Sequence, residues 1–358
     1  MAKLDTRMAL LRLILIAAAA TLFGSPLQSN GTRADPTDIA DYRPARTVSL
    51  GGSVDWDNLY FDPASHRVFI AHGNEVTVVA GRTGELVGHV QELDGVHGLA
   101  AIPELGKGYA VSRGTQVAST FSLQSLLPAK SVPIGRAGDF LLYDPASGRV
   151  FVMDQDATVA TVIDSAQDLV VTTLQLGGIA EQAVADGSGH VFINLADNRE
   201  VIRVDTRALK IEARWAIPTC ESPHGSAIDA ASRRLFVSCL NARLLVLDTT
   251  NGQLIATLPI GKGTDGAAYD PRRKRVFSSN GADGTLSVIS QLGPDQYVWV
   301  RNVPTARFGR TMALDPDTGR IYIPVAELER IDPHPATKWG AYVFKPGSLR
   351  LMMFDPTF

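Results

Sequence analysis

The sequence predicts an all-β fold, a seven-bladed β-propeller with four antiparallel strands in each blade. Two observations lead to this prediction. A motif that runs from a short apolar strand through a turn, Asp-Pro in its regular form, into a second apolar strand recurs along the chain, with seven copies in all. After the N-terminal 34 residues, no apolar period of helical length is present. A sequence repeat that supplies four short strands, and so one blade per copy, is typical of propellers.

The repeat is clearest where it reads YFDPASHRVFIA from Tyr60, YDPASGRVFVM from Tyr143 and YDPRRKRVFSS from Tyr269. A degenerate copy from Ala101 fills the one gap between the more regular copies. Each copy has one anchor position where its first strand ends, and these anchors are Asp62, Ile102, Asp144, Asp186, Asp229, Asp270 and Asp315. Their spacings of 40, 42, 42, 43, 41 and 45 residues indicate seven equivalent units.

The sixth unit shows the four expected strands, which we call a, b, c and d from the channel outward. They are predicted at residues 266–270, 275–279, 285–290 and 296–304. The Asp-Pro pair after strand a predicts a type I turn, in which Asp accepts backbone hydrogen bonds and Pro fixes φ. Strand a is almost wholly apolar, as expected of a strand buried on both faces.

The seventh unit contains strands a, b and c, and the chain then ends at Phe358. Its strand d must therefore come from another part of the chain. Arg46 to Leu50 precedes the first strand a and resembles the outer strands of other units. We expect this N-terminal strand to close the last blade, which would remove an exposed sheet edge. The prediction is one propeller domain over residues 42–358.

The N-terminal residues are typical of a secretory signal. Lys3, Arg7 and Arg12 precede an apolar run from Leu13 to Phe23, which is too short to span a bilayer comfortably. We predict a signal peptide over residues 1–34, with cleavage between Gly24 and Ala34, and a flexible leader over 35–41. An uncleaved membrane anchor is the alternative. No later apolar stretch is long enough to span a membrane, so we expect a periplasmic or secreted protein.

Charge and cysteine content restrict the classes of function. With 34 Lys+Arg and 37 Asp+Glu the net charge is −3, and loss of residues 1–34 removes four cations and one carboxylate, which brings it near −6. Such a balance does not favour binding to nucleic acid through phosphates. Cys220 and Cys239 flank the first two strands of the fifth unit, so we predict a disulfide. A catalytic pair of Cys with His224 is the alternative.

One column of the repeat contains only ionisable residues. The position five residues before each anchor begins strand a, at the mouth of the predicted channel, and its occupants are Asp57, His97, Asp139, Glu181, His224, Asp265 and Arg310. We call these the seven mouth residues. Chance would give such a column with a probability of roughly 1 in 1,000, allowing for the columns available.

Two roles are open for the mouth residues. They could satisfy backbone groups and water within the channel, as buried polar side chains do. Alternatively, they could bind a ligand: a cation, a metal with its water, or a polyhydroxylated or amine ligand. His97, Glu181, His224 and Asp265 are the candidates for a divalent metal, although no short-spaced ligand motif supports one. Arg310 would hold an anionic substituent or neutralise neighbouring carboxylates.

Other features fall on the same predicted face. The connection from Pro324 to Gly340 is long and rich in proline, which is typical of a lid, a binding loop or an ordered decoration. Trp56, Phe308 and Trp339 are candidates for stacking on a ligand, with core packing as the alternative role.

The repeated DPxxxRVF motif, the stretch LDTTNGQLIATLPIGKGTDGAAYDP and the ending KPGSLRLMMF resemble the YVTN/YncE-like family of bacterial exported β-propellers. The segments CESPHGSAID and RRLFVSC are also similar to this family, and the resemblance covers nearly the whole mature chain. It implies an exported propeller, and some members are implicated in DNA binding. The fold is shared with propeller lactonases, virginiamycin B lyase and the heavy subunit of quinoprotein amine dehydrogenases, so fold alone assigns no reaction.

Three functions follow as hypotheses. The first is a monomeric, non-catalytic propeller that binds a small molecule or a protein partner at the channel mouth. The second is a metal-assisted lyase or lactone hydrolase, with His224 or His97 as base and the carboxylates holding the ion. The third, implied by the resemblance, is binding of single-stranded DNA, which the acidic mouth disfavours. A divalent metal is the one cofactor that the sequence suggests.

Overall fold

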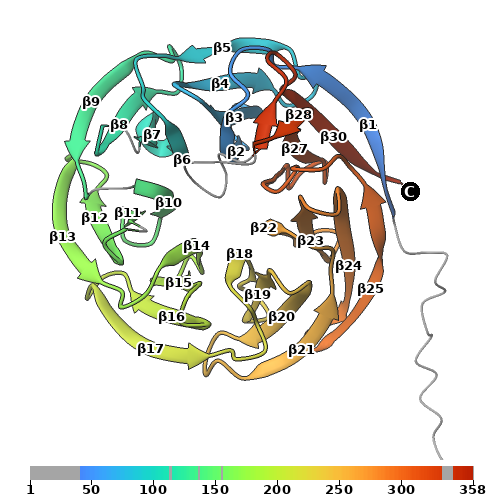
Figure 1. The fold of residues 1–358 in the computed structure, drawn as a ribbon. Helices are drawn as coiled ribbons and strands as arrows, with labels where there is room; N and C mark the ends of the chain where they lie inside the picture. Colours follow the sequence, from blue (N-terminus) through green and yellow to red (C-terminus); the bar gives the residue numbers. More distant parts are fainter. Residues whose placement is uncertain (1–40, 113–114, 136–137, 155, 333–341, 358) are drawn as a thin grey trace, which may run out of the picture. The chain divides into compact units, whose positions relative to one another are not determined.

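The computed structural model describes residues 41–357, except 113–114, 136–137, 155 and 333–341. The described residues form seven four-stranded antiparallel sheets that surround a central channel as blades (Figure 1). The predicted all-β, seven-bladed propeller is therefore confirmed. The predicted signal peptide (1–34) and the leader up to residue 40 lie outside the described residues. Within the described part of the chain, no helix is long and apolar enough to cross a membrane.

Six blades each consist of four consecutive strands, which follow one another from the channel outward. Blade 1 contains β2 (Trp56–Asp62), β3 (Arg67–His72), β4 (Glu75–Ala80) and β5 (Leu86–Val90). Blade 2 contains β6 (Val96–Ile102), β7 (Lys107–Ser112), β8 (Val117–Ser122) and β9 (Pro128–Pro133), with the 3-10 turn η2 (Pro103–Leu105) after β6. Blade 3 contains β10 (Gly138–Asp144), β11 (Arg149–Asp154), β12 (Val159–Asp164) and β13 (Leu169–Gln175).

The next three blades repeat this arrangement. Blade 4 contains β14 (Ala180–Ala185), β15 (His190–Leu195), β16 (Glu200–Asp205) and β17 (Lys210–Ala216). Blade 5 contains β18 (Pro223–Asp229), β19 (Arg234–Cys239), β20 (Arg243–Asp248) and β21 (Leu254–Pro259). Blade 6 contains β22 (Thr264–Asp270), β23 (Arg275–Asn280), β24 (Thr285–Gly293) and β25 (Gln296–Pro304).

Blade 7 joins the two ends of the described chain. Its strands are β26 (Ala313–Leu314), β27 (Ile321–Val325), β30 (Arg350–Thr357) and, outermost, β1 (Asp41–Ser49). β1 runs antiparallel to β30, with Asp41 opposite Thr357 and Ser49 opposite Arg350. The predicted N-terminal strand is thus confirmed as the closing strand, although it begins at residue 41, earlier than the predicted residue 46. Figure 1 shows β1 in blue beside β30 in red.

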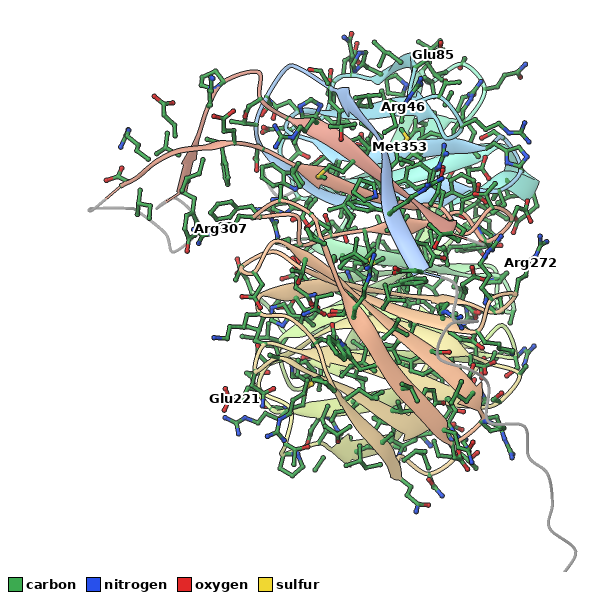
Figure 2. All side chains as sticks on the ribbon, turned by 90° about the vertical axis from the view of Figure 1, so that its right-hand side faces the viewer. Arg46, Glu85, Glu221, Arg272, Arg307 and Met353 are labelled. Atoms are coloured by element: carbon green, nitrogen blue, oxygen red, sulfur yellow. A yellow bond between two sulfur atoms is a disulfide. The ribbon has the colours of Figure 1, made fainter. Side chains whose placement is uncertain are left out.

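A two-stranded hairpin, β28 (Leu328–Ile331) with β29 (Tyr342–Phe344), projects from the connection between β27 and β30. Figure 2 shows it standing out from the face that carries Glu221 and Arg307, whereas Arg272 lies on the opposite face. The loops between blades therefore share one face, and the turns after the innermost strands occupy the other. The long connection predicted over 324–340 is thus partly an ordered hairpin.

The anchor aspartates confirm the predicted turn chemistry. Asp62, Asp144 and Asp270 are each at most 1% exposed. Their carboxylates accept the backbone N–H two residues later, at 3.1, 3.2 and 2.9 Å respectively. Because a buried carboxylate needs such partners, each turn supplies the hydrogen bonds that make its own Asp tolerable in the core.

Neighbouring blades share hydrophobic cores, and the closing strand contributes to one of them. Tyr42 of β1 is fully buried beside Phe277, with ring centroids 4.8 Å apart. The same core includes Ile321 and Ile323 of β27. β1 therefore adds apolar contact between blades 6 and 7, in addition to its ladder of hydrogen bonds with β30.

We predict that Tyr42→Ala lowers the free energy of unfolding by about 3 kcal/mol, because it leaves a cavity between two blades. Urea denaturation followed by tryptophan fluorescence measures the change. Arg43→Ala, at an exposed position of the same strand, is the matched control and should leave stability within about 0.5 kcal/mol of wild type. Equal losses in the two variants would contradict a core role for the closing strand.

Candidate functional site

A cavity of about 980 Å³ lies at the channel mouth. All seven mouth residues line it, one from each blade. The side chains of all seven are only 14% to 22% exposed. The structure thus brings together every residue of the column that the sequence singled out, whereas their role as ligand-binding groups stays a prediction.

A β-bulge places each of the first six mouth residues. Where strand a begins to pair with strand b, the register shifts by one residue, for example between Trp56 and Leu59 or between Gly138 and Phe140. The same irregularity occurs at the start of β6, β14, β18 and β22. The mouth residue falls within the shifted segment in all six strands. Bulges turn a side chain out of the regular alternation of a strand, and here they accompany the side chains that face the channel.

Glycine follows both mouth histidines because adjacent blades approach closely there. A Cβ atom at Gly98 would lie 2.7 Å from the backbone oxygen of Asp139 in the next blade. At Gly225 it would lie 2.7 Å from the backbone nitrogen of Ala267, also in the next blade. The His-Gly pairs of blades 2 and 5 therefore combine a channel-facing side chain with close inter-blade packing.

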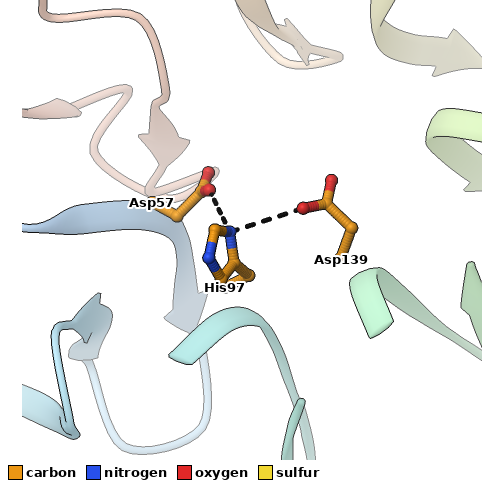
Figure 3. Close-up of side chains that lie close together, drawn as sticks. All are labelled: Asp57, His97 and Asp139. Atoms are coloured by element: carbon orange, nitrogen blue, oxygen red, sulfur yellow. Dashed lines mark hydrogen bonds and ion pairs between the residues drawn. The ribbon is translucent and has the colours of Figure 1, made fainter. Parts of the chain in front are cut away.

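Three mouth residues of blades 1 to 3 form a first triad (Figure 3). The Nδ1 atom of His97 lies 2.8 Å from Oδ2 of Asp57 and 3.4 Å from Oδ1 of Asp139. The imidazole thus sits between carboxylates of the two neighbouring blades. This arrangement stabilises a proton on Nδ1, because either carboxylate can accept a hydrogen bond from it.

Three mouth residues of blades 4 to 6 form a second triad, Glu181, His224 and Asp265. One ligand atom from each lies within 4.8 Å of the other two. The Nε2 atom of His224 is 3.8 Å from Oε1 of Glu181, and its Nδ1 atom is 2.9 Å from the backbone oxygen of Ser222. Both triads have donor sets of one imidazole and two carboxylates, which suit a divalent metal.

Arg310 of blade 7 connects the two triads. Its Nε donates to Oδ2 of Asp265 at 2.8 Å, and one terminal nitrogen lies 3.5 Å from Oδ2 of Asp57. Burial alone would lower the pKa of Arg310, but the carboxylates of Asp57 and Asp265 outweigh it and raise that pKa. Burial raises the pKa of Asp265, and the charges of Arg310 and His224 oppose this increase.

The mouth is electronegative as a whole. Counting the four carboxylates and the one guanidinium, and leaving the two histidines out, the formal charge is −3 in a cavity partly shielded from water. Coulombic interactions are stronger in such a site than in bulk water. The arrangement therefore favours a cation, or a ligand that donates several hydrogen bonds.

The aromatic candidates pack beneath the hairpin. Trp56 is 4% exposed, and its ring centroid lies 5.0 Å from that of Phe344. Phe308 is 8% exposed and contacts both Tyr342 and Phe344, with centroids 4.9 and 5.1 Å away. Packing thus accounts for most of their surface. Trp56 also borders the cavity, so stacking on a ligand stays a prediction for it, and Trp339 lies outside the described residues.

The predicted disulfide between Cys220 and Cys239 is confirmed, with their Cα atoms 5.2 Å apart. Both residues are fully buried. Because the two sulfur atoms bond to each other, neither serves as a free nucleophile beside His224, and that alternative is wrong for this state. The bond ties the loop before β18 to the end of β19, next to the second triad.

Sequence reasoning missed several residues that line the cavity, including Gln182, Tyr342 and Phe344. The alternation of Tyr342 and Phe344 is a signal for a strand that presents aromatic side chains, but it lies just past the connection predicted over 324–340. The first triad also went unseen as a separate group, although its members come from three successive blades and could have been found by grouping neighbours within the column.

We predict that Cys220→Ser/Cys239→Ser lowers the free energy of unfolding by about 3 kcal/mol, since the disulfide closes a loop with a sequence separation of 19. Urea denaturation with and without dithiothreitol measures the effect. Reductant should destabilise the wild type by a similar amount and leave the double variant unchanged. A wild type whose denaturation midpoint ignores reductant would contradict the prediction.

We predict that Arg310→Met destabilises the protein by about 2 to 3 kcal/mol near pH 7.5, because it leaves Asp57 and Asp265 unneutralised. The raised pKa of Asp265 means that the folded state retains a proton that the unfolded state releases, so this contribution to stability falls as pH rises. Without the charge of Arg310 the pKa of Asp265 rises further, so the folded variant keeps this proton to a higher pH. The loss of stability caused by Arg310→Met should therefore be smaller near pH 5 than near pH 7.5.

Urea denaturation at both pH values tests this prediction. Arg272→Met is the control, because Arg272 is exposed on the opposite face and should show little change at either pH. A deficit for Arg310→Met that is equal at the two pH values would argue against electrostatic control by this residue.

Comparisons with known proteins support the fold. No protein-family model matches the chain, and no curated protein matches its sequence. Among solved structures, a chain of the hydrazine synthase of Kuenenia stuttgartiensis is similar with a TM-score of 0.66 and 16% identity, covering 77% of this chain and 93% of that one. A chain of a mitotic checkpoint complex is similar with a TM-score of 0.71 and 13% identity, covering 96% and 98%. At such identities the likeness establishes the propeller fold alone.

Proposed function

We propose that this protein is an exported propeller that binds a cationic or polyhydroxylated ligand, or a protein partner presenting such a group, at the channel mouth. The observation that supports this most is the convergence of the seven mouth residues on one cavity of about 980 Å³. A volume of this size accommodates a small molecule. The negative formal charge of the mouth would attract ammonium groups or metal ions, and its carboxylates accept hydrogen bonds from hydroxyl groups.

Export is part of the proposal. The disulfide of Cys220 and Cys239 is consistent with an oxidising compartment such as the periplasm. The cationic and apolar N-terminal residues fit a secretory signal. The resemblance to YVTN/YncE-like propellers agrees with this location.

The proposed role is binding without catalysis. A lyase or lactone hydrolase would need His97 or His224 as base. The Nδ1 atom of His97 is already hydrogen-bonded to Asp57, which leaves His224, held through Nδ1 by the backbone oxygen of Ser222, as the candidate base of that alternative. Single-stranded DNA is disfavoured as a ligand, because four of the seven mouth residues are carboxylates and would repel phosphates.

Native mass spectrometry of mature protein from its export compartment, prepared without chelator, tests the proposal. Wild type should carry a stoichiometric adduct. The variant Asp139→Asn/Glu181→Gln removes two charges from the mouth and should lose that adduct. Glu85→Gln removes a carboxylate from an exposed turn remote from the mouth and should retain it.

Two outcomes would count against the proposal. An adduct that persists in Asp139→Asn/Glu181→Gln would place binding elsewhere on the protein. A bare mass for wild type, even after incubation with an extract of the same compartment, would favour a purely structural role for the mouth residues.

A further inference from the structure

The two mouth triads have the same residue types but different internal bonding. Each consists of a histidine flanked by carboxylates from the blades on either side, and His224 lies three blades further along the ring than His97. If both triads served only to satisfy polar groups, both would be expected to close on themselves through direct hydrogen bonds. The first triad does so between its histidine and Asp57, whereas the second keeps its Nε2 and carboxylate atoms further apart.

In the first triad, the Nδ1 atom of His97 and Oδ2 of Asp57 are 2.8 Å apart, which is an ordinary hydrogen-bond length. Two atoms that ligate the same metal ion, each about 2.1 Å from it, are normally at least about 3 Å apart. A terminal nitrogen of Arg310 also lies 3.5 Å from Oδ2 of Asp57. These contacts leave no position for an ion between His97 Nδ1 and Asp57.

In the second triad, the hydrogen bonding of His224 fixes its tautomer. Its Nδ1 atom lies 2.9 Å from the backbone oxygen of Ser222. A carbonyl oxygen only accepts hydrogen bonds, so Nδ1 carries a hydrogen, and the neutral form of this imidazole presents its lone pair at Nε2. This lone pair faces Oε1 of Glu181 at 3.8 Å, which is too long for a hydrogen bond. Two acceptor atoms thus face each other across a gap.

A metal ion accounts for such a gap. Nitrogen and oxygen ligands lie about 2.0 to 2.2 Å from Zn²⁺, so two ligands of one ion are separated by roughly 3 to 4.4 Å, and 3.8 Å falls in this range. One ligand atom of Asp265 lies within 4.8 Å of a ligand atom of His224 and one of Glu181. Metal-binding histidines commonly donate their second N–H to a backbone carbonyl, as His224 does to Ser222.

The carboxylate of Asp265 is also held in place from outside the triad. Arg310 donates from Nε to Oδ2 of Asp265 at 2.8 Å. Such an outer contact orients a ligating carboxylate and balances part of its charge. The second triad therefore combines three donor atoms at suitable separations with supporting contacts to two of its three members.

We propose that Glu181, His224 and Asp265 bind one divalent transition-metal ion of the Zn²⁺ class, and that Asp57, His97 and Asp139 form a structural hydrogen-bonded triad. This inference rests on the proposed binding function and specifies the class of cation that the second triad would bind. Three protein ligands leave at least one coordination position for a water or a ligand group in the cavity. The metal would then be the part of the mouth that contacts an incoming ligand.

Isothermal titration calorimetry with ZnCl₂ on mature, chelator-treated protein tests the proposal. Wild type should bind one equivalent, and His224→Ala should weaken binding by more than about 100-fold, because it removes a direct ligand. His97→Ala is the comparison variant in the first triad, and it should weaken zinc binding far less than His224→Ala does, because His97 is not proposed as a ligand. Glu181→Gln keeps the side-chain size and serves as the second ligand variant should His224→Ala fold poorly by circular dichroism.

X-ray absorption spectroscopy of the zinc-loaded wild type should show nitrogen and oxygen ligands with one imidazole. The proposal is overturned if zinc fails to bind, if His97→Ala weakens binding as much as the ligand variants do, or if neither His224→Ala nor Glu181→Gln changes it. In the first case His224 and Glu181 would form an ion pair with a protonated imidazole. If native mass spectrometry shows an organic adduct at the mouth but zinc does not bind, the proposed binding function stands and only the metal proposal is rejected.

Discussion

The geometry of the channel mouth depends on one constraint: seven twisted sheets must meet around an axis while their innermost strands remain close to one another. The one-residue bulges at the start of six of these strands coincide with this meeting point. They bring one side chain per blade to the channel, and the glycines after His97 and His224 allow the neighbouring backbones to approach. The polar mouth is thus a product of the same local feature in successive blades.

Most of the fold was predictable because the information for it is local and repeated. Each Asp-Pro turn specifies its own geometry, and the period of the anchors fixes the number of blades. Even the degenerate second repeat was placed correctly, with Ile102 at its anchor, because the spacing of its neighbours required a unit there. The start of the closing strand was less predictable, since its pairing with β30 joins residues about 300 positions apart.

The membership of the mouth was predictable, whereas its internal organisation was not. A column of ionisable residues follows from the repeat register, so the sequence is sufficient to identify all seven positions. The difference between the triads depends on the orientation of two imidazoles and on a backbone carbonyl at Ser222, and neither leaves a trace in residue type. Tyr342 and Phe344 belong to an insertion that has no counterpart in the other repeats, so periodicity gives no information about them.

The pairing of β1 with β30 also determines when the site can exist. The seventh blade needs the first and the last strands of the propeller together, so the ring stays open until β1 and β30 have paired. Arg310, which connects the two triads, belongs to this last blade. A chain terminated before β30 would therefore lack the closed ring, and one terminated before Arg310 would also lack the cation that balances the mouth carboxylates.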